Sequence, residues 1–313
     1  MITKAFVLGA GLGMRLRPLT EDLPKPLIPI YQKPLITFVL DHLLAAGVRS
    51  FVINTHHRTE VFGEFFTEGH YRNCPVELVH EPKILGTGGG IKNVERLFRD
   101  GPFIVYSGDI LTDIDVARLL EEHLRLENDV TLAVRETHLG QDIAVEGNRV
   151  VDIENRFGHP GRCDFAGVSI WTPAIFERIP AGESVSFIPF VRDWIGEGGR
   201  IGGVIVNEGK WFNIGNRAEY LDVHRTIADE NWRPAHVREA DWPVRIAGSA
   251  KIDASARLSG FYSVGADCVI GGGASVENTI LLPGAQIASN SQLQSCIVRA
   301  RQQARGTLRD TDI

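Results

Sequence analysis

Hydrophobic residues recur along the chain in two different patterns. Between residues 4 and 228, short apolar runs alternate with segments whose apolar residues fall at helical spacing. From residue 244 onward, an aliphatic residue returns every six positions. The first pattern is typical of strands that alternate with helices, and the second is typical of stacked coils of short strands.

The first pattern predicts an α/β fold. Its first four strands are separated by helices, an arrangement that favours a mixed, mainly parallel, Rossmann-like sheet with helices on both faces. The expected strands are 5–8, 50–55, 76–80, 103–106, 130–134, 143–145, 150–153 and 165–171. The expected helices are 34–48, 60–66, 90–98, 114–126, 186–195 and 217–228.

Polar or glycine residues stand at the carboxyl ends of the first four expected strands. They are Gly9, Asn54, Glu81 and Asp109. Ligands of parallel sheets bind at this edge, so these four positions are expected to lie on one rim.

The tail predicts a left-handed parallel β-helix of hexapeptide repeats, in which each flat side takes one hexad. The register slips by one residue after Pro283 and Gly284, and the pattern predicts about three coils between residues 244 and 298. The repeating aliphatic positions are Ile246, Ile252, Leu258, Val264, Ile270, Val276, Leu282, Ile287 and Leu293.

The two patterns imply three parts: a first domain over 1–228, a linker over 229–243 and the β-helix over 244–313. Some parallel β-helices carry out acyl transfer with a histidine base, but the last histidine here is His236. We therefore expect the coil to cap the first domain or to join copies of the chain into a homo-oligomer.

Composition narrows the class of protein. The net charge of −6 provides no basic surplus for binding nucleic acid. No apolar run is long enough to span a membrane, and Met1 leads straight toward the first strand without a signal peptide, so a cytoplasmic location is expected. The four cysteines are scattered without a metal-binding spacing, as expected for reduced thiols.

The glycine loop after the first strand is the main candidate for chemistry. Gly9, Gly11 and Gly13 allow backbone N–H groups to approach a bulky anion, and Arg15, Arg17 and Lys25 add positive charge. Prolines disfavour the helix that a dinucleotide fingerprint needs, and the Gly-Lys-Ser/Thr of a Walker loop is missing. A purely structural turn would not explain the adjacent cations, so the loop predicts a polyphosphate site.

The same stretch resembles the signature of the sugar-phosphate nucleotidylyltransferases. That signature reads Gly-x-Gly-x-Arg-Leu-x-Pro-Leu-Thr, a short spacer and Pro-Lys-Pro-Leu, and residues 9–27 match it almost without a gap. The resemblance implies a nucleotide-diphospho-sugar transferase fold, with an NTP and a sugar 1-phosphate as substrates and Mg²⁺ as cofactor. The motifs resemble both mannose-1-phosphate guanylyltransferases and N-acetylmuramate 1-phosphate uridylyltransferases.

The resemblance assigns the catalytic groups. It places Arg15 on the β- and γ-phosphates, Lys25 on the α-phosphate and the transition state, and Asp109 of Ser-Gly-Asp on Mg²⁺. An aspartate after a strand is also a common helix N-cap. At the second metal position the family has aspartate and this chain has Asn213, which offers an amide oxygen but no charge. Weaker metal binding, a metal site that relies more on Asp109 and the substrate phosphates, or reduced activity is expected.

The resemblance also implies the substrate contacts. Glu81 would accept from a ring N–H of the base, which leaves guanine and uracil open, and Arg156 would replace the lysine that binds the sugar phosphate. The implied nucleotide-binding residues are Leu8, Gly9, Ala10, Gly11, Gly13, Arg15, Glu81, Gly86 and Thr87. The implied sugar-binding residues are Asp109, Gly140, Glu154, Arg156 and Gly167.

Two rival interpretations stay open. Asn213 and Asn155 stand where the family has aspartate and lysine, which suits a regulatory paralogue that binds nucleotide sugars with little turnover. A CTP-dependent transferase that acts on a non-sugar phosphate is the second alternative.

Overall fold

The structure is a computed structural model that describes residues 2–137, 139–140 and 142–313. The chain folds into two compact units. Unit 1 contains the residues up to Leu12 and Val39–Trp211, and unit 2 contains Gly13–Phe38 and Phe212–Ile313. These units are discontinuous in sequence, whereas the domains expected from the sequence are continuous, so the boundaries at 228 and 244 stay a prediction.

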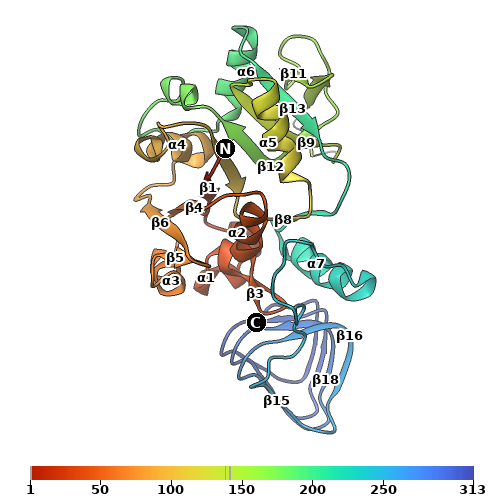
Figure 1. Ribbon diagram of the computed structural model, residues 1–313. Coiled ribbons are helices and arrows are strands. Elements are labelled where there is room, and N and C mark those ends of the chain that lie inside the picture. The colour runs from red at the N-terminus through yellow and green to blue at the C-terminus, as the bar shows by residue number, and fades with distance from the viewer. Residues whose placement is uncertain (1, 138, 141) are drawn as a thin grey trace. The chain divides into compact units, whose positions relative to one another are not determined.

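Unit 1 is built on a mixed sheet of ten strands in the order β10-β11-β13-β9-β12-β7-β1-β4-β6-β5 (Figure 1). Strands β7, β1, β4 and β6 are mutually parallel, and β12 runs antiparallel to both of its neighbours. The strands are β1 (Lys4–Leu8), β4 (Ser50–Thr55), β5 (His70–Tyr71), β6 (Cys74–His80), β7 (Phe103–Ser107), β9 (Val130–Arg135), β10 (Ile143–Glu146), β11 (Arg149–Ile153), β12 (Asp164–Trp171) and β13 (Ile201–Ile205).

Helices α3 (Thr59–Phe65), α4 (Gly86–Asn93), α5 (Val116–Arg125) and α6 (Ile188–Gly196) pack against this sheet. The short strand β8 (Ile110–Thr112) follows β7. The chain passes between the units at Leu12 and Gly13, then within α2 (Leu35–Ala45), and again within β14 (Trp211–Asn213). Within the described residues, none of the helices has the length and hydrophobicity needed to cross a membrane.

The α/β fold predicted from the hydrophobic pattern is confirmed. Each expected strand of unit 1 is present, and β4 covers the predicted residues without change. The sheet is apolar on its inner strands because Phe6, Val105 and Leu132 are buried in one continuous core. Phe103 of β7 stacks on Phe176, with ring centroids 5.5 Å apart.

The expected helix at 90–98 begins earlier, at Gly86. Backbone of residues 183–187 lies against its first turn, and a Cβ at Gly89 would lie 2.1 Å from the Glu183 carbonyl oxygen. A Cβ at Gly86 would lie 2.7 Å from the Val185 carbonyl oxygen. The glycines therefore form a helical turn that another backbone segment can approach closely.

In unit 2, the segment that follows the glycine loop is irregular. It contains single 3-10 turns at Met14–Leu16 and Lys25–Leu27, the short helix α1 (Leu19–Asp22) and the strands β2 (Pro29–Ile30) and β3 (Lys33–Pro34). This segment packs on α7 (Arg217–Glu230), where the Tyr31 hydroxyl donates to the His224 carbonyl at 2.9 Å. The Tyr220 hydroxyl donates to the Pro29 carbonyl at 2.6 Å.

The tail forms stacked coils of parallel strands, as expected for a parallel β-helix; its handedness stays a prediction. One face is β15-β17-β19-β22 and another is β16-β18-β20-β23, with β21 beside β18. The strands are β15 (Lys251–Ile252), β16 (Arg257–Val264), β17 (Val269–Ile270), β18 (Ser275–Leu281), β19 (Gln286–Ile287), β20 (Gln292–Gln294), β21 (Ile297–Val298), β22 (Gln303–Ala304) and β23 (Thr307–Arg309).

The hexads explain this stacking. Leu258 lies opposite Val276, three hexads later, and Val276 lies opposite Leu293, where the slip after Pro283 has removed one residue. These aliphatic residues point into the coil, and Val276 and Leu293 are part of its buried core. The stack continues past the predicted limit of residue 298, because Leu293 pairs with Leu308 of β23.

Candidate functional site

In unit 1, the predicted rim is built around a buried asparagine at the carboxyl end of β4. The Asn54 Oδ1 atom accepts hydrogen bonds from the Gly9 N–H at 2.7 Å and the Ala10 N–H at 3.2 Å. Its Nδ2 atom donates to Glu81 Oε1 at 2.7 Å. One side chain therefore connects the ends of β1, β4 and β6, which lie side by side and parallel.

The close approach at this rim requires small residues. A Cβ at Gly9 would lie 2.7 Å from the Asn54 carbonyl oxygen, and a Cβ at Gly90 would lie 3.1 Å from both Asn54 Nδ2 and Glu81 Oε1. Gly9 therefore lets the loop turn directly over the end of β4, and Gly90 lets α4 pack on the polar pair.

Glu81 is 1% exposed, and both of its carboxylate oxygens already accept protein donors. Besides Asn54, the Leu85 N–H donates to Oε2 at 3.1 Å. The His56 ring nitrogen Nδ1 lies 2.7 Å from the Glu81 carbonyl oxygen. In the structure the Glu81 carboxylate connects Asn54 with the backbone at Leu85, and the direct contact between Glu81 and the base stays a prediction.

Several backbone N–H groups of the glycine loop and of the first turn of α4 donate hydrogen bonds to other groups of the protein. Those of Gly9 and Ala10 hold Asn54, and the N–H groups of Gly88 and Gly89 donate to the Val185 carbonyl at 2.8 and 3.3 Å. Thr87 Oγ1 accepts from the Phe187 N–H at 3.2 Å. These contacts hold the backbone of the rim in place, and the N–H groups that make them are already used within the protein.

Asp109 is half-buried just beyond the end of β7. The preceding Gly108 donates its N–H to the Leu8 carbonyl at 2.9 Å, and a Cβ there would lie 2.7 Å from that oxygen. Gly167 has a left-handed φ of 87°, and a Cβ on it would meet the side chain of Ile110 at 2.7 Å. Asp109 thus follows a turn that is fixed on the end of β1, beside the glycine loop.

The predicted sugar contacts of the 152–159 loop are organised by Asp152, which sequence reasoning missed. Its Oδ1 accepts from the Arg156 N–H at 2.7 Å, and its Oδ2 accepts from the N–H groups of Phe157 at 2.7 Å and His159 at 3.0 Å. Glu154 is exposed on this loop, and its Oε2 accepts from Arg192 Nη1 at 2.5 Å. Gly140, another predicted sugar contact, is exposed with φ 84°.

The remaining predicted residues belong to unit 2. Arg15 is exposed and Lys25 is half-buried, each on its own 3-10 turn. Gly13 has a left-handed φ of 59°, and a Cβ there would lie 2.7 Å from Thr20 Cγ2. An Arg15 guanidinium nitrogen lies 3.0 Å from the place of a Cβ on Gly215, two residues after Asn213. Because Gly215 has no side chain, the Arg15 guanidinium can lie against its backbone.

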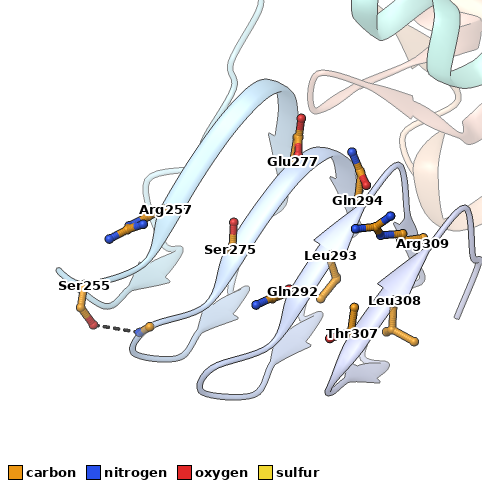
Figure 2. Close-up of a pocket in the computed structure, with 11 residues that line it drawn as sticks. Ser255, Arg257, Ser275, Glu277, Gln292, Leu293, Gln294, Thr307, Leu308 and Arg309 are labelled. Atoms are coloured by element: carbon orange, nitrogen blue, oxygen red, sulfur yellow. Dashed lines mark hydrogen bonds between the residues drawn. The ribbon is translucent and has the colours of Figure 1, made fainter.

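The β-helix has a hollowed outer face of its own. A groove of about 620 Å³ runs across β16, β18, β20 and β23, and Figure 2 shows polar side chains pointing outward along it. Arg257, Ser275, Gln292 and Thr307 form one paired row of this face. No histidine follows His236 in the sequence, so the groove lacks the usual base for acyl transfer.

Across residues 2–137, 139–140 and 142–313, no three histidine, cysteine, aspartate or glutamate side chains gather closely enough to hold a metal ion by themselves. The four cysteines, all described, are buried free thiols, as expected.

We expect Asn54→Ala to lower the free energy of unfolding by about 3 kcal/mol, because it leaves the buried Glu81 carboxylate and two loop amides without their partner. Urea denaturation of the purified variant measures this loss. Asn93→Ala, at an exposed helical position, is the control and should change the stability by less than about 0.5 kcal/mol. Equal effects of the two variants would contradict the role given to Asn54.

Burial of Asp152 acts to raise the pKa of its carboxyl, but hydrogen bonds from backbone N–H groups, His159 first, outweigh it and lower that pKa below its usual value. The carboxylate therefore stabilises the fold above the unfolded-state pKa of about 3.9, and this contribution is lost as the pH falls through the lowered folded-state pKa. We expect Asp152→Asn to cost about 2 kcal/mol at pH 7, because an amide nitrogen must then face a backbone donor.

The difference between wild type and Asp152→Asn should shrink below a pH of about 3.9, which urea titrations across pH can follow. Asp100→Asn is the matched control because that side chain is 91% exposed. If the difference in the free energy of unfolding between wild type and Asp152→Asn stayed constant with pH, the charge of Asp152 would not contribute to stability.

Comparison with known proteins places this architecture in a family. The model of the nucleotidyl transferase family matches residues 4–156, which contain the glycine loop, Asn54, Glu81 and Asp109. The mannose-1-phosphate guanylyltransferase of Mycobacterium tuberculosis is 30% identical over 93% of this chain and 82% of its own. The UTP–glucose-1-phosphate uridylyltransferase of Synechocystis is 24% identical over 95% of this chain and 87% of its own.

A solved structure with the same fold is a putative glucose-1-phosphate thymidylyltransferase from Bacillus anthracis. It superposes with a TM-score of 0.62 at 17% identity and covers 70% of this chain and 92% of its own. The two relatives above span nearly the whole chain, and the signature loop lies within the matched region. The chain belongs to the nucleotidyl transferase family of sugar-phosphate nucleotidylyltransferases.

Proposed function

We propose that the protein transfers a nucleotidyl group from an NTP to a sugar 1-phosphate, giving a nucleotide sugar and pyrophosphate. The observation that carries this proposal is the rim held by Asn54, where a glycine loop, a buried Glu81 and Asp109 meet at the carboxyl edge of parallel strands. That edge is where such sheets bind their ligands. Family membership gives the class of reaction.

The reaction needs positioning and positive charge more than proton transfer. A phosphate oxygen of the sugar 1-phosphate attacks the α-phosphorus, the bond from that phosphorus to the bridging oxygen breaks, and pyrophosphate leaves with the electron pair. In this proposal Arg15 binds the β- and γ-phosphates and Lys25 stabilises the charge that develops at the α-phosphate. Glu81 and the backbone at Gly86 receive the base, Glu154 binds sugar hydroxyls, and Arg156 binds the phosphate of the sugar 1-phosphate.

The donor set suits Mg²⁺ that is shared with substrate. Mg²⁺ binds through one or two carboxylates together with substrate phosphates, so a large protein cluster is not required. Asp109 would supply the carboxylate and Asn213 an amide oxygen. When bound, the ion would supply charge that neutralises the phosphate oxygens.

A guanylyltransferase that uses a manno-configured sugar is the preferred substrate class. The relatives include mannose-1-phosphate guanylyltransferases and the D-glycero-α-D-manno-heptose 1-phosphate guanylyltransferase of Aneurinibacillus thermoaerophilus, which is 29% identical over 59% of this chain and 81% of its own. Asn213 favours a second candidate, a regulatory paralogue with weakened turnover. Homo-oligomerisation through the β-helix stays a prediction.

Pyrophosphate release should be measured across GTP, UTP, ATP, CTP and dTTP, each paired with several sugar 1-phosphates and with Mg²⁺. We expect one active pair, and we expect Lys25→Ala to lower its kcat about a hundredfold because a fixed charge at the transition state is lost. Lys251→Ala, on an exposed residue of β15, is the charge-matched control. A grid without turnover, in a protein that still binds nucleotide, would favour the regulatory paralogue.

The metal assignment has a separate test. Asn213→Asp adds the missing carboxylate and should lower the half-saturating Mg²⁺ concentration by roughly tenfold, since ligand charge tunes affinity for hard cations. Asn93→Asp adds the same charge at an exposed helical site and should leave the Mg²⁺ requirement unchanged. An unchanged requirement in Asn213→Asp would remove residue 213 from the metal site.

A further inference from the structure

Two segments of unit 2 hold residues that the proposed function needs. Residues 13–25 contain Arg15 and Lys25, and residues 213–217 contain Asn213 and the start of α7. Both segments are attached to one small part of the β-helix, residues 295–299 together with 311–313, called here the terminal coil.

The first attachment is made by Arg299. Its Nη1 atom donates to Glu21 Oε2 at 3.2 Å and to Asp22 Oδ2 at 3.0 Å, so one guanidinium is shared by two adjacent carboxylates of α1. The Arg299 side chain is only 20% exposed. Its two carboxylate partners are 50% and 57% exposed, so the buried guanidinium is the fixed side of this charge-assisted interaction.

This attachment continues toward the glycine loop. The residue next to Glu21 is Thr20, which is fully buried, and its hydroxyl donates to the Gly13 carbonyl at 2.8 Å. Gly13 in turn accepts from the Leu16 N–H at 2.9 Å and so closes the turn that holds Arg15. Movement of α1 would therefore displace the turn of Arg15.

The second attachment is made by Arg217, the first residue of α7. Its Nε atom donates to Asp312 Oδ1 at 2.6 Å, and its Nη2 atom donates to the Ser295 carbonyl. The loop just before it is closed by a hydrogen bond of 2.7 Å from the Gly215 N–H to the Asn213 carbonyl. The same N–H donates to Glu219 Oε2 of α7 at 2.6 Å, so the Asn213 loop is fixed to the start of this helix.

Backbone pairing joins the two attachment points. The Arg299 N–H donates to the Ile313 carbonyl at 2.7 Å, and the Ile313 N–H donates to the Ile297 carbonyl at 3.0 Å. Asp312 is therefore held beside the strand that leads to Arg299. At the other end, the Arg15 guanidinium lies against Gly215, so the two segments also meet each other.

We propose that the terminal coil positions Arg15 and Asn213 for the triphosphate and its metal ion, with Arg299 and Arg217 as positioning residues. The β-helix then helps to form the nucleotide site, because its attachment sets the distance between Arg15, which binds phosphate, and Asn213, which binds the metal ion. This inference rests on the proposed function.

Arg299→Gln and Arg217→Gln test it in the full-length protein, with Arg309→Gln on the exposed face of the same β-helix as the matched control. We expect Arg299→Gln to raise the KM for the NTP, and Arg217→Gln to raise the half-saturating Mg²⁺ concentration, each roughly threefold to tenfold. At saturating substrate and metal, kcat should stay within about twofold of wild type. Arg299→Lys keeps the charge and should recover most of the NTP affinity.

A double-mutant cycle separates positioning from general loss of stability. Glu21→Gln with Asp22→Asn removes the same interaction from the other side, so combining it with Arg299→Gln should add little to the rise in KM. Additive effects, or a KM equal to that of Arg309→Gln, would overturn the inference while the proposed function stands. A wild-type protein that releases no pyrophosphate with any substrate pair would overturn both.

Discussion

The buried pairing of Asn54 with Glu81 is the interaction on which the rim depends. A carboxylate that is 1% exposed must receive hydrogen bonds from protein donors, because burying it without them is costly. Asn54 supplies one donor and uses its oxygen to hold two loop amides, so satisfying Glu81 also fixes the path of the glycine loop. The geometry of the rim proposed to bind the nucleotide is thus a consequence of burying one carboxylate.

The glycine-rich sequence at 86–90 shows how one pattern can serve two purposes. It resembles a turn that reads a base, yet its closest neighbours include the backbone atoms of residues 183–187. Those neighbours also accept or donate hydrogen bonds at the first turn of α4. Packing alone therefore requires small residues here, whether or not this turn also contacts a base.

Local pattern predicted most of the fold, since strands such as β4 and the hexads of the β-helix are encoded by hydrophobic spacing. It also predicted that Gly9, Asn54, Glu81 and Asp109 share a rim, because parallel strands end together. It did not predict the roles of Asp152 or Arg299. Asp152 accepts hydrogen bonds from backbone N–H groups of a tight turn, and Arg299 contacts residues more than two hundred positions away in the sequence. Such pairings have no periodicity, so a single sequence contains no signal for them.

Unit 2 contains more than the coils of the β-helix, because residues 13–38 also belong to it. Residues 13–38 pack with α7 and the β-helix. Tyr31 donates a hydrogen bond to the His224 carbonyl, and Gln32 donates one to the Ser263 hydroxyl. The signature motif is therefore divided: Gly9 and Gly11 belong to unit 1, and Arg15 and Lys25 belong to unit 2, which also contains the β-helix. Because residues 13–38 pack within the unit that contains the β-helix, the stability of the β-helix and the placement of Arg15 and Lys25, the cations proposed to bind phosphate, cannot vary independently.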